Sequence, residues 1–222
     1  MSAASSTRRS PGRPAANDGG DSDGQRTRLL DAALARFVRD GMSATTARGI
    51  AEEAGVTPAL LNYYFGGRDA LQQAVVEERL MPVLRGIGAQ LSTAGDDPAA
   101  LIAGFTSAIG KAVAEHPWLP TLWLREVLLD GGALREVFLQ RGADMLPRTL
   151  AQRFAAAQKA GRLNPDLDPR LLVISLVGLT LFPAAAAPIW RQVFAADDID
   201  MTGLQDHTWR LLNDGLRLED SE

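Results

Sequence analysis

One stretch of this sequence, from Thr45 to Leu71, restricts the possible folds more than any other part of the chain. Its letters are TTARGIAEEAGVTPALLNYYFGGRDAL. Ile50 and Ala54 fall on one side of a short helix because their spacing is helical. Gly55 follows at the point where a left-handed residue can end that helix at low cost. The first half of the stretch therefore predicts a short helix that stops at about Gly55.

A second short helix is predicted from Pro58 to about Tyr64. Thr57 suits the N-cap, and proline is tolerated at the first helical position because its missing N–H would be unpaired there anyway. Ala51 is small enough for two helices to approach closely, and Leu61 supplies an apolar contact between them. This is the layout of a helix-turn-helix that reads DNA. The alternative is an ordinary corner between two helices of an all-α core.

Helices are also predicted on both sides of this pair. From about Asp23 to Arg39, apolar residues repeat at helical spacing with arginines and aspartates opposite them. The members of this stripe are Leu29, Leu30, Ala33, Leu34 and Phe37. After Gly66 and Gly67, a long helix runs from about Arg68 to Leu91, with a bend near Pro82. This long helix would connect the first part of the chain to the rest.

The remaining sequence predicts helices at about 97–115, 118–129, 133–159, 168–190 and 202–217, separated by proline and glycine signals. Sustained alternation of apolar and polar residues, which a half-buried strand requires, does not occur. We therefore expect an all-α protein of about nine helices. Residues 1–22 would form a disordered arm, residues 23–70 a three-helix DNA-binding domain, and residues 71–222 a larger helical domain for ligand binding and dimerisation.

Composition places the chain among cytoplasmic globular proteins. Its 222 residues, 46% of them hydrophobic, can bury a proper core. The most apolar stretch, Leu171 to Ile189, is interrupted by Pro183 and Pro188, so no membrane span is expected. The N-terminus has no apolar segment of the kind a secretory signal needs, and the absence of cysteine excludes disulfides and thiolate chemistry.

Charge is distributed unevenly along the chain. The formal net charge is −4, but residues 1–68 hold 9 arginines against 7 acidic residues. The predicted helix-turn-helix thus lies in the positive part, which is modest support for contacts with phosphate. Arg8, Arg9 and Arg13 in the N-terminal arm could enter a minor groove, which attracts inserted arginine. A solvated tail is the alternative reading of this arm.

Residues suited to catalysis are sparse. His116 and His207 have neither the histidine partner nor the carboxylate spacing of a metal site. Asp197, Asp198 and Asp200 cluster in a predicted loop, where capping of the next helix is the ordinary explanation. The sequence has no nucleophile elbow, phosphate loop or dinucleotide fingerprint. We expect no catalytic residue, no metal site and no cofactor.

Large apolar side chains gather instead in the predicted C-terminal domain. Together with a charged pair they predict a ligand pocket, although plain core packing is the alternative for each residue taken alone. The predicted pocket residues are Phe105, Ile109, Trp118, Leu122, Trp123, Arg125, Glu126, Phe138 and Met145. The last two predicted helices carry longer apolar faces than a monomer of this size needs. Pairing them with a second copy would form a four-helix bundle and a homodimer.

These features resemble the tetracycline-repressor (TetR) type of bacterial transcription regulator. The resemblance rests on the amphipathic first helix, on TTARGIAEEAGVTPALLNYYF as the helix-turn-helix, and on FGGRDAL at the start of the fourth helix. It covers about the first 70 residues. It implies a homodimer whose recognition helices enter successive major grooves of a palindromic operator, about 34–36 Å apart. It also implies a small, largely apolar effector that binds the C-terminal domain and releases the DNA.

The resemblance also implies roles for individual residues. Thr46 and Arg68 would contact phosphates, and Arg48 is a further candidate for DNA contact. The residues expected to face the groove are Thr57, Pro58, Ala59, Asn62 and Tyr63. The family often has lysine where Arg68 stands and tyrosine where Asn62 stands. Asn62 could pair with adenine or contact the backbone, so no operator sequence is predicted.

Three functions of different classes remain open at this point. The first is a ligand-responsive repressor that binds double-stranded DNA. The second is a helical enzyme or small-molecule carrier, which would need a convergent acid, base or metal set in the C-terminal pocket. The third is a dimerising adaptor that binds no ligand, which a search for bound apolar metabolites would separate from the first.

Overall fold

The computed structural model describes residues 18–142 and 146–214. Within these ranges every regular element is a helix, so the predicted all-α fold is confirmed. The predicted residues Arg8, Arg9, Arg13 and Met145 lie outside the described part of the chain.

The first three helices are α1 (Asp18–Asp40), α2 (Ala47–Glu53) and α3 (Pro58–Phe65). Local signals place the two short ones as predicted. The Thr46 hydroxyl accepts a hydrogen bond from Gly49 N at 3.1 Å, and the Thr57 hydroxyl accepts one from Leu60 N at 3.4 Å. Each bond satisfies a backbone donor that the first turn of a helix leaves unpaired. Gly55 has φ +68°, which glycine adopts without strain, and it turns the chain between α2 and α3.

A small apolar core holds these three helices together as the N-terminal unit (α1–α3). The predicted stripe of α1 is buried throughout, and Leu61 of α3 is completely buried against it. On α2, Ile50 and Ala51 have no exposed surface. Arg36 of α1 donates to Gly49 O at 2.8 Å, which adds a polar contact between α1 and α2. The unit is therefore fully packed, although its helices are short.

The helix predicted from Arg68 to Leu91 is continuous but changes its winding. It consists of α4 (Arg68–Val75), the π-helical turn η1 (Val76–Leu80) and α5 (Met81–Ser92). Pro82 has no N–H to bond with Glu78 O, and the Arg79 guanidinium donates to that carbonyl at 3.4 Å. A wider turn directly before the proline is consistent with this missing bond. The bend predicted near Pro82 thus coincides with a π-helical turn.

The remaining helices form the C-terminal unit (α5–α12). They are α6 (Pro98–Glu115), α7 (Leu119–Trp123), η2 (Leu124–Leu128), α8 (Arg135–Val137), η3 (Phe138–Gly142), α9 (Pro147–Lys159), α10 (Pro169–Ala185), α11 (Ala187–Phe194) and α12 (Met201–Asp214).

Two predicted helices are divided in the structure. The one expected at 133–159 becomes α8 with η3 and then α9, which begins at Pro147. The one expected at 168–190 ends at Ala185, and α11 leaves it at an angle of 71°. Pro188 lies in the first turn of α11, where its missing N–H costs nothing, whereas it would interrupt a continuous helix.

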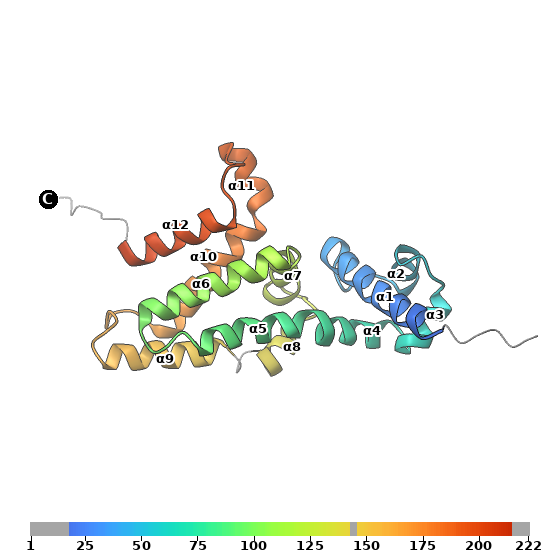
Figure 1. The fold of residues 1–222 in the computed structure, drawn as a ribbon, viewed down its shortest axis with the longest axis horizontal. Helices are drawn as coiled ribbons and strands as arrows, with labels where there is room; N and C mark the ends of the chain where they lie inside the picture. The colour runs from blue at the N-terminus through green and yellow to red at the C-terminus, as the bar shows by residue number, and fades with distance from the viewer. Residues whose placement is uncertain (1–17, 143–145, 215–222) are drawn as a thin grey trace, which may run out of the picture.

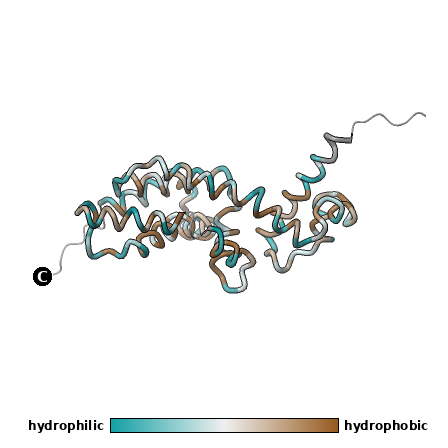
Figure 2. The backbone as a smooth tube through the Cα atoms, turned by 90° about the horizontal axis from the view of Figure 1, so that it is seen from below, coloured by the Kyte–Doolittle hydropathy of each residue, from teal (hydrophilic) through white to brown (hydrophobic). Residues whose placement is uncertain are grey.

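Figure 1 shows how these helices are arranged. The α4–η1–α5 helix runs along the molecule from the N-terminal unit into the C-terminal unit, where α6 packs against α5. Helices α9, α10 and α12 complete the C-terminal unit, and α11 projects from it. The hydropathy-coloured trace in Figure 2 shows the N-terminal unit at one end of an elongated molecule and the end of α12 at the other.

The last helix packs within the chain. α12 lies against α6 and α10, and Thr208 donates to Leu179 O at 3.2 Å. The large apolar side chains of α12 that we expected at a dimer interface are half-buried here, whereas several on α10 and α11 are exposed. Among the described residues, no single helix is long and apolar enough to span a membrane. The bent pair α10 and α11 has the necessary length and apolarity only when the two helices are taken together.

Candidate nucleic-acid interface and ligand cavity

Helix α3 presents one exposed face to solvent. Pro58, Ala59, Asn62 and Tyr63 are all exposed on it, and the Tyr63 side chain is 80% exposed. Leu61, between them in sequence, points into the core of the N-terminal unit and fixes the orientation of the helix. An exposed, rigidly anchored helix of this length can enter a major groove.

Three further residues predicted to contact DNA are Thr46, expected at a phosphate, Thr57, expected to face the groove, and Arg48. Thr46 at the N-cap of α2 and Thr57 at the N-cap of α3 are exposed. The N-termini of both helices are therefore open to an anion, since their dipoles are positive there. Arg48 is 83% exposed and forms an ion pair with Glu52 at 2.9 Å. The hydrogen bond to Glu52 raises the pKa of the Arg48 guanidinium further above its already high ordinary value.

Arg68 is placed differently from the other predicted DNA-contacting residues. Its side chain is half-buried, and Nε donates to Thr45 O at 2.7 Å while Nη2 donates to Met42 O. The guanidinium therefore holds the turn between α1 and α2 from within the unit. Its contact with phosphate stays a prediction, but the structure adds a bracing contact that the sequence did not suggest.

A group of charged residues attaches α2 to α1 near this face. Glu53 Oε2 of α2 lies 2.7 Å from Arg39 Nη2 and 3.7 Å from Arg36 Nε, both on α1. Within α1, Arg36 Nε also lies 3.2 Å from Asp40 Oδ2. Arg39 donates hydrogen bonds to both carboxyls, and these bonds lower the pKa of Glu53 and the pKa of Asp40. Both carboxyls are thus kept ionised and close to the arginines, which are less available to DNA than Arg48.

The C-terminal unit encloses a cavity of about 250 Å³ whose walls are almost entirely apolar. Of the predicted pocket residues, Phe105, Ile109, Trp123 and Phe138 line it, and the rings of Trp123 and Phe138 meet edge to face at 4.8 Å between centroids. The other lining residues are Leu84, Ile87, Leu119, Leu128, Leu146, Pro147, Arg148, Leu150, Val173, Ile174, Val177 and Leu181. Such a cavity suits a small ligand with little polarity.

Four predicted pocket residues lie elsewhere, and these placements correct the prediction. Leu122 is buried in the core without lining the cavity. Arg125 and Glu126 follow Trp123 on the same helical segment but reach the N-terminal unit. Glu126 Oε1 accepts from Met42 N at 2.9 Å, and Arg125 Nη1 donates to Arg39 O at 2.9 Å. Helical rotation by two or three residues from Trp123 turns both side chains away from the cavity.

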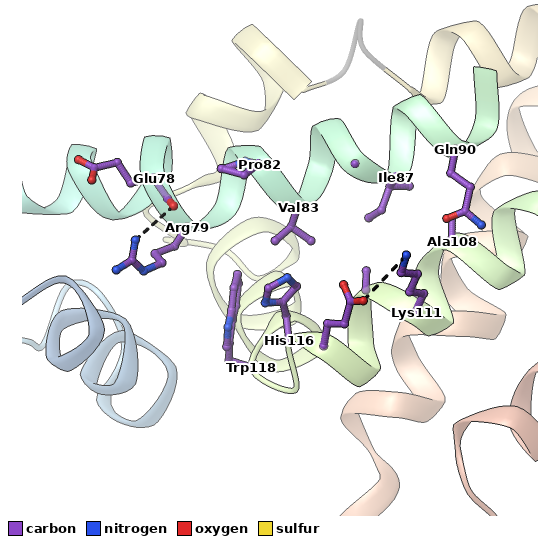
Figure 3. A pocket seen from close by; sticks show the side chains of 13 residues that line it. Glu78, Arg79, Pro82, Val83, Ile87, Gln90, Ala108, Lys111, His116 and Trp118 are labelled. Carbon is purple, nitrogen blue, oxygen red and sulfur yellow. Dashed lines mark hydrogen bonds and ion pairs between the residues drawn. The ribbon is translucent and has the colours of Figure 1, made fainter. Parts of the chain in front are cut away.

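Trp118, the fourth, lines a different depression, an open groove of about 330 Å³ between α5 and α6. Figure 3 shows the Trp118 and His116 side chains next to each other below α5, with Lys111 further along the groove. The ring centroids of His116 and Trp118 are 5.5 Å apart. This groove has charged groups of both signs that already form ion pairs, including Glu78 with Arg26 and Lys111 with Glu115. It lacks the enclosed apolar surface of the cavity.

Sequence reasoning missed the contribution of α5 and α10 to the cavity. Leu84 and Ile87 come from α5, and Val173, Val177 and Leu181 come from α10. Helical periodicity identifies these residues as facing the interior. It cannot distinguish a side chain that lines an empty space from one that fills the core, because both are apolar and inward-facing.

Comparison with known proteins covers both parts of the molecule. Residues 29–75, which include the helix-turn-helix, match the model of the tetR family of bacterial regulatory proteins. The HTH-type transcriptional regulator BetI of Brucella canis is 39% identical to this chain over 82 residues. These residues are 36% of this chain and 41% of that relative, so the match spans well under two thirds of the relative's length.

Solved structures extend the likeness in fold to most of the chain. A TetR-like transcriptional regulator from Rhodococcus sp. RHA1 has a TM-score of 0.63 at 21% identity, covering 88% of this chain and 97% of that one. The regulator FadR from Bacillus subtilis, in complex with stearoyl-CoA, has a TM-score of 0.64 at 17% identity, covering 86% and 99%. The N-terminal part of the chain thus matches the tetR family of bacterial regulatory proteins, and the fold of most of the chain is similar to that of a TetR-like transcriptional regulator.

Proposed function

We propose that this protein is a cytoplasmic, ligand-responsive repressor of transcription that binds a palindromic operator as a homodimer. In this proposal residues 23–70 bind DNA, and residues 71–222 bind the effector and form the dimer. A small, largely apolar effector occupies the cavity and releases the DNA. No catalytic step is part of this function.

The observation that carries the proposal is the physical link between the exposed face of α3 and the cavity. The α4–η1–α5 helix begins at Arg68, which holds the turn before α2, and its far part places Leu84 and Ile87 in the cavity wall. A ligand that displaces α5 also displaces the start of α4 and the N-terminal unit attached to it. The ligand shifts the equilibrium only if it binds the released conformation more tightly than the DNA-bound one.

The cavity wall indicates the class of effector. Among its described lining residues, Arg148 alone is charged, and aromatic and aliphatic side chains form the remainder. Burial of apolar surface would therefore supply most of the binding free energy. The FadR regulator of similar fold was solved with stearoyl-CoA. For this chain we propose a smaller apolar molecule. Its cavity of about 250 Å³ is smaller than the pockets that usually hold drug-sized ligands, which measure about 300–1,000 Å³.

The exposed faces of α10 and α11 support the proposed dimer. On α10, Leu171, Ile174 and Phe182 are each at least 60% exposed and lie at helical spacing around Gly178. A Cβ built on Gly178 would meet no atom within 4 Å, so this glycine is not needed for packing inside the chain. It would allow a partner helix to approach closely. We propose that α10 and α11 contribute more of the dimer surface than α12, which packs against α6.

DNA binding can be tested with the intergenic DNA upstream of the protein's own gene. We expect the affinity to fall steeply with salt concentration, as it does when arginines neutralise phosphates. Arg48→Ala should weaken binding and reduce the salt slope by about 1. Arg85→Ala removes the same charge from an exposed position on α5, away from α3, and should leave binding unchanged. Equal effects of the two variants would contradict the proposed interface.

Release can be tested with decanoic acid as a probe. We expect it to bind the full chain, raise its thermal stability and weaken its affinity for the same DNA. Binding of the probe without any change in DNA affinity would refute the regulatory part of the proposal and leave the DNA-binding part intact.

A further inference from the structure

Two neighbouring residues of η2 hold the end of α1 and the turn that follows it. Arg125 Nη1 donates to Val38 O at 3.1 Å and to Arg39 O at 2.9 Å. Glu126 Oε1 accepts from Met42 N at 2.9 Å. We call Arg125 and Glu126 the η2 clamp.

The chemistry of the clamp matches the polarity of the groups that it holds. The last carbonyls of α1 are unpaired within the helix and carry the negative end of its dipole, and Arg125 places a cation on them. Met42 N is a buried donor, and Glu126 supplies an acceptor while being only 4% exposed. Gly41 allows this close approach, since a Cβ there would lie 3.2 Å from Arg125 Nε. The bond from Met42 N to Glu126 is buried, whereas those from Arg125 are partly buried or exposed. Hydrogen bonds to charged groups are among the stronger ones, above all when they are buried.

The turn held by the clamp is also held from the side of α4. Met42 donates its N–H to Glu126, and its carbonyl accepts from Arg68. Arg68 also donates to Thr45 O, immediately before the N-cap of α2. The turn from Gly41 to Thr45 is thus connected through hydrogen bonds both to η2 and to the start of α4.

The same helical turn forms part of the cavity wall. Trp123 immediately precedes η2, Leu128 is its last residue, and both line the cavity. The second carboxylate oxygen of Glu126 accepts from Ala133 N at 3.1 Å, which connects it to the loop before α8 and Phe138. Phe138 packs on Trp123. A shift of the Trp123–Phe138 pair would therefore move η2 and the loop that together orient Glu126.

One polar atom in this wall has no hydrogen-bond partner in the described part of the chain. The indole N–H of Trp123 is buried and has no hydrogen-bond partner among the described residues. An unpaired buried donor costs free energy, so a ligand or a movement that brought an acceptor to this N–H would recover that cost. η2 is a π-helical turn, and such turns frequently lie at functional sites.

We propose that Arg125 and Glu126 are positioning residues that transmit the state of the cavity to the DNA-binding face through the Gly41–Thr45 turn. This route runs beside the one through α4 and α5 and crosses directly from the cavity wall to the end of α1. Figure 1 shows the proximity on which it depends, with α7 lying beside the end of α1. The proposal rests on the proposed function for its biological meaning, but its physical content can be tested without DNA.

The first test measures hydrogen exchange of the Met42 amide in the full chain. In Glu126→Gln, an amide NH₂ replaces one of the two carboxylate oxygens that accept from Met42 N and Ala133 N, so one of these two hydrogen bonds is lost. We expect exchange at Met42 or Ala133 to rise about tenfold or more, as expected for loss of a hydrogen bond to a charged group. Glu136→Gln is the matched control, since Glu136 of α8 is exposed and accepts its hydrogen bond from the Gln140 side chain. Unchanged exchange at both amides in Glu126→Gln would overturn the clamp.

Arg125→Lys provides a second variant in case Glu126→Gln does not fold. It keeps the charge, but its ammonium lacks the rigid planar guanidinium that holds Nη1 between the two carbonyls, so we expect faster exchange at Gly41 and Met42. Rates at these two amides equal to the wild type would also count against the clamp.

The second test asks whether the cavity wall and the turn are coupled. Phe138→Ala removes the side chain that supports Trp123, and Leu181→Ala removes a cavity-lining side chain on α10. Neither residue belongs to the N-terminal unit. We expect Phe138→Ala to raise Met42 exchange several-fold and Leu181→Ala to leave it near the wild-type rate. If Phe138→Ala has no effect at Met42, or if Leu181→Ala has an equal one, the proposed route is wrong.

The two proposals fail in distinguishable ways. A chain that does not bind its upstream DNA but shows the Phe138→Ala effect at Met42 would lose the proposed function and keep the coupling. A chain that binds DNA and releases it with decanoic acid, but shows no such effect, would keep the function and lose this route. In that case α4 and α5 would carry the signal alone.

Discussion

The N-terminal unit and the C-terminal unit use apolar residues in opposite ways. In the N-terminal unit, short helices are closed by side-chain caps, and the inward-facing residues are almost completely buried. In the C-terminal unit, a similar composition leaves about 250 Å³ unfilled, and the lining residues Leu128 and Ile174 remain 49% and 65% exposed. One unit is packed to keep a surface in a fixed shape, and the other is packed incompletely.

This difference has a physical consequence for each unit. A surface that must fit DNA gains from a rigid support, because contacts to base edges depend on exact placement. A cavity must instead stay open, which sacrifices the dispersion and burial free energy that filling it would provide. Substitutions should therefore destabilise the first unit wherever they alter packing, whereas filling the cavity should stabilise the second.

The largest effect is expected for Leu61→Ala. Leu61 is completely buried and attaches α3 to α1, so its truncation should lower the free energy of unfolding by about 2–5 kcal/mol. Leu181→Ala, in the cavity wall, should cost less, because part of its surface already faces empty space. Urea unfolding followed by circular dichroism measures both. A larger loss in Leu181→Ala would contradict the contrast between the two units.

A pair of valine-to-phenylalanine substitutions should give effects of opposite sign. Val177→Phe fills part of the cavity and should stabilise the chain by about 0.5–2 kcal/mol while weakening binding of decanoic acid. Val75→Phe adds the same atoms to the fully packed end of α4 and should destabilise it by about 1–3 kcal/mol. Thermal unfolding with and without the probe distinguishes them. Destabilisation by both would show that the cavity is not available for filling.

Removal of a helix cap should have a smaller effect. Thr57→Ala deletes the oxygen that accepts from Leu60 N, and we expect a loss of about 1 kcal/mol in stability. Thr57→Ser keeps that oxygen and should preserve stability. Because Thr57 also belongs to the predicted DNA-contacting residues, DNA affinity measured on both variants would separate the cap from a contact of the methyl group.

The smallest effect is expected at the surface between the two units. Arg26 and Glu78 form an ion pair at 2.5 Å with both side chains about a third exposed, so Arg26→Gln should cost only about 0.2–1 kcal/mol. The hydrogen bond from Arg26 lowers the pKa of the Glu78 carboxyl. The pair therefore stabilises the fold above the ordinary glutamate pKa of about 4.3 and stops doing so as the pH falls through the lowered value.

Unfolding measured at neutral pH and again below about pH 4 checks this prediction. The difference between wild type and Arg26→Gln should shrink at the lower pH and at high salt. If the difference in unfolding free energy between wild type and Arg26→Gln changes with neither pH nor salt, Arg26 acts through packing. One such contact is with the Phe65 ring, whose centroid lies 5.0 Å from the guanidinium carbon.

Elements whose signals are local could be predicted from the amino-acid sequence alone. Thr46, Thr57 and Pro58 mark helix starts, Gly55 marks the turn, and the apolar stripe of α1 defines an inward face. Each of these depends on residues within about one or two helical turns, so spacing is sufficient to recognise them. The helix-turn-helix and the all-α class follow from such signals, and the tetR-family resemblance was carried by the same residues.

The side chains that enclose the cavity, and those that connect the two units, could be identified only from the folded chain. Trp123, Arg125 and Glu126 are almost adjacent in sequence, yet Trp123 lines the cavity while the other two reach α1 and the turn at Met42. These contacts join residues more than 80 positions apart. Helical spacing assigns a residue to a face, but the neighbour of that face depends on how the whole chain folds back on itself.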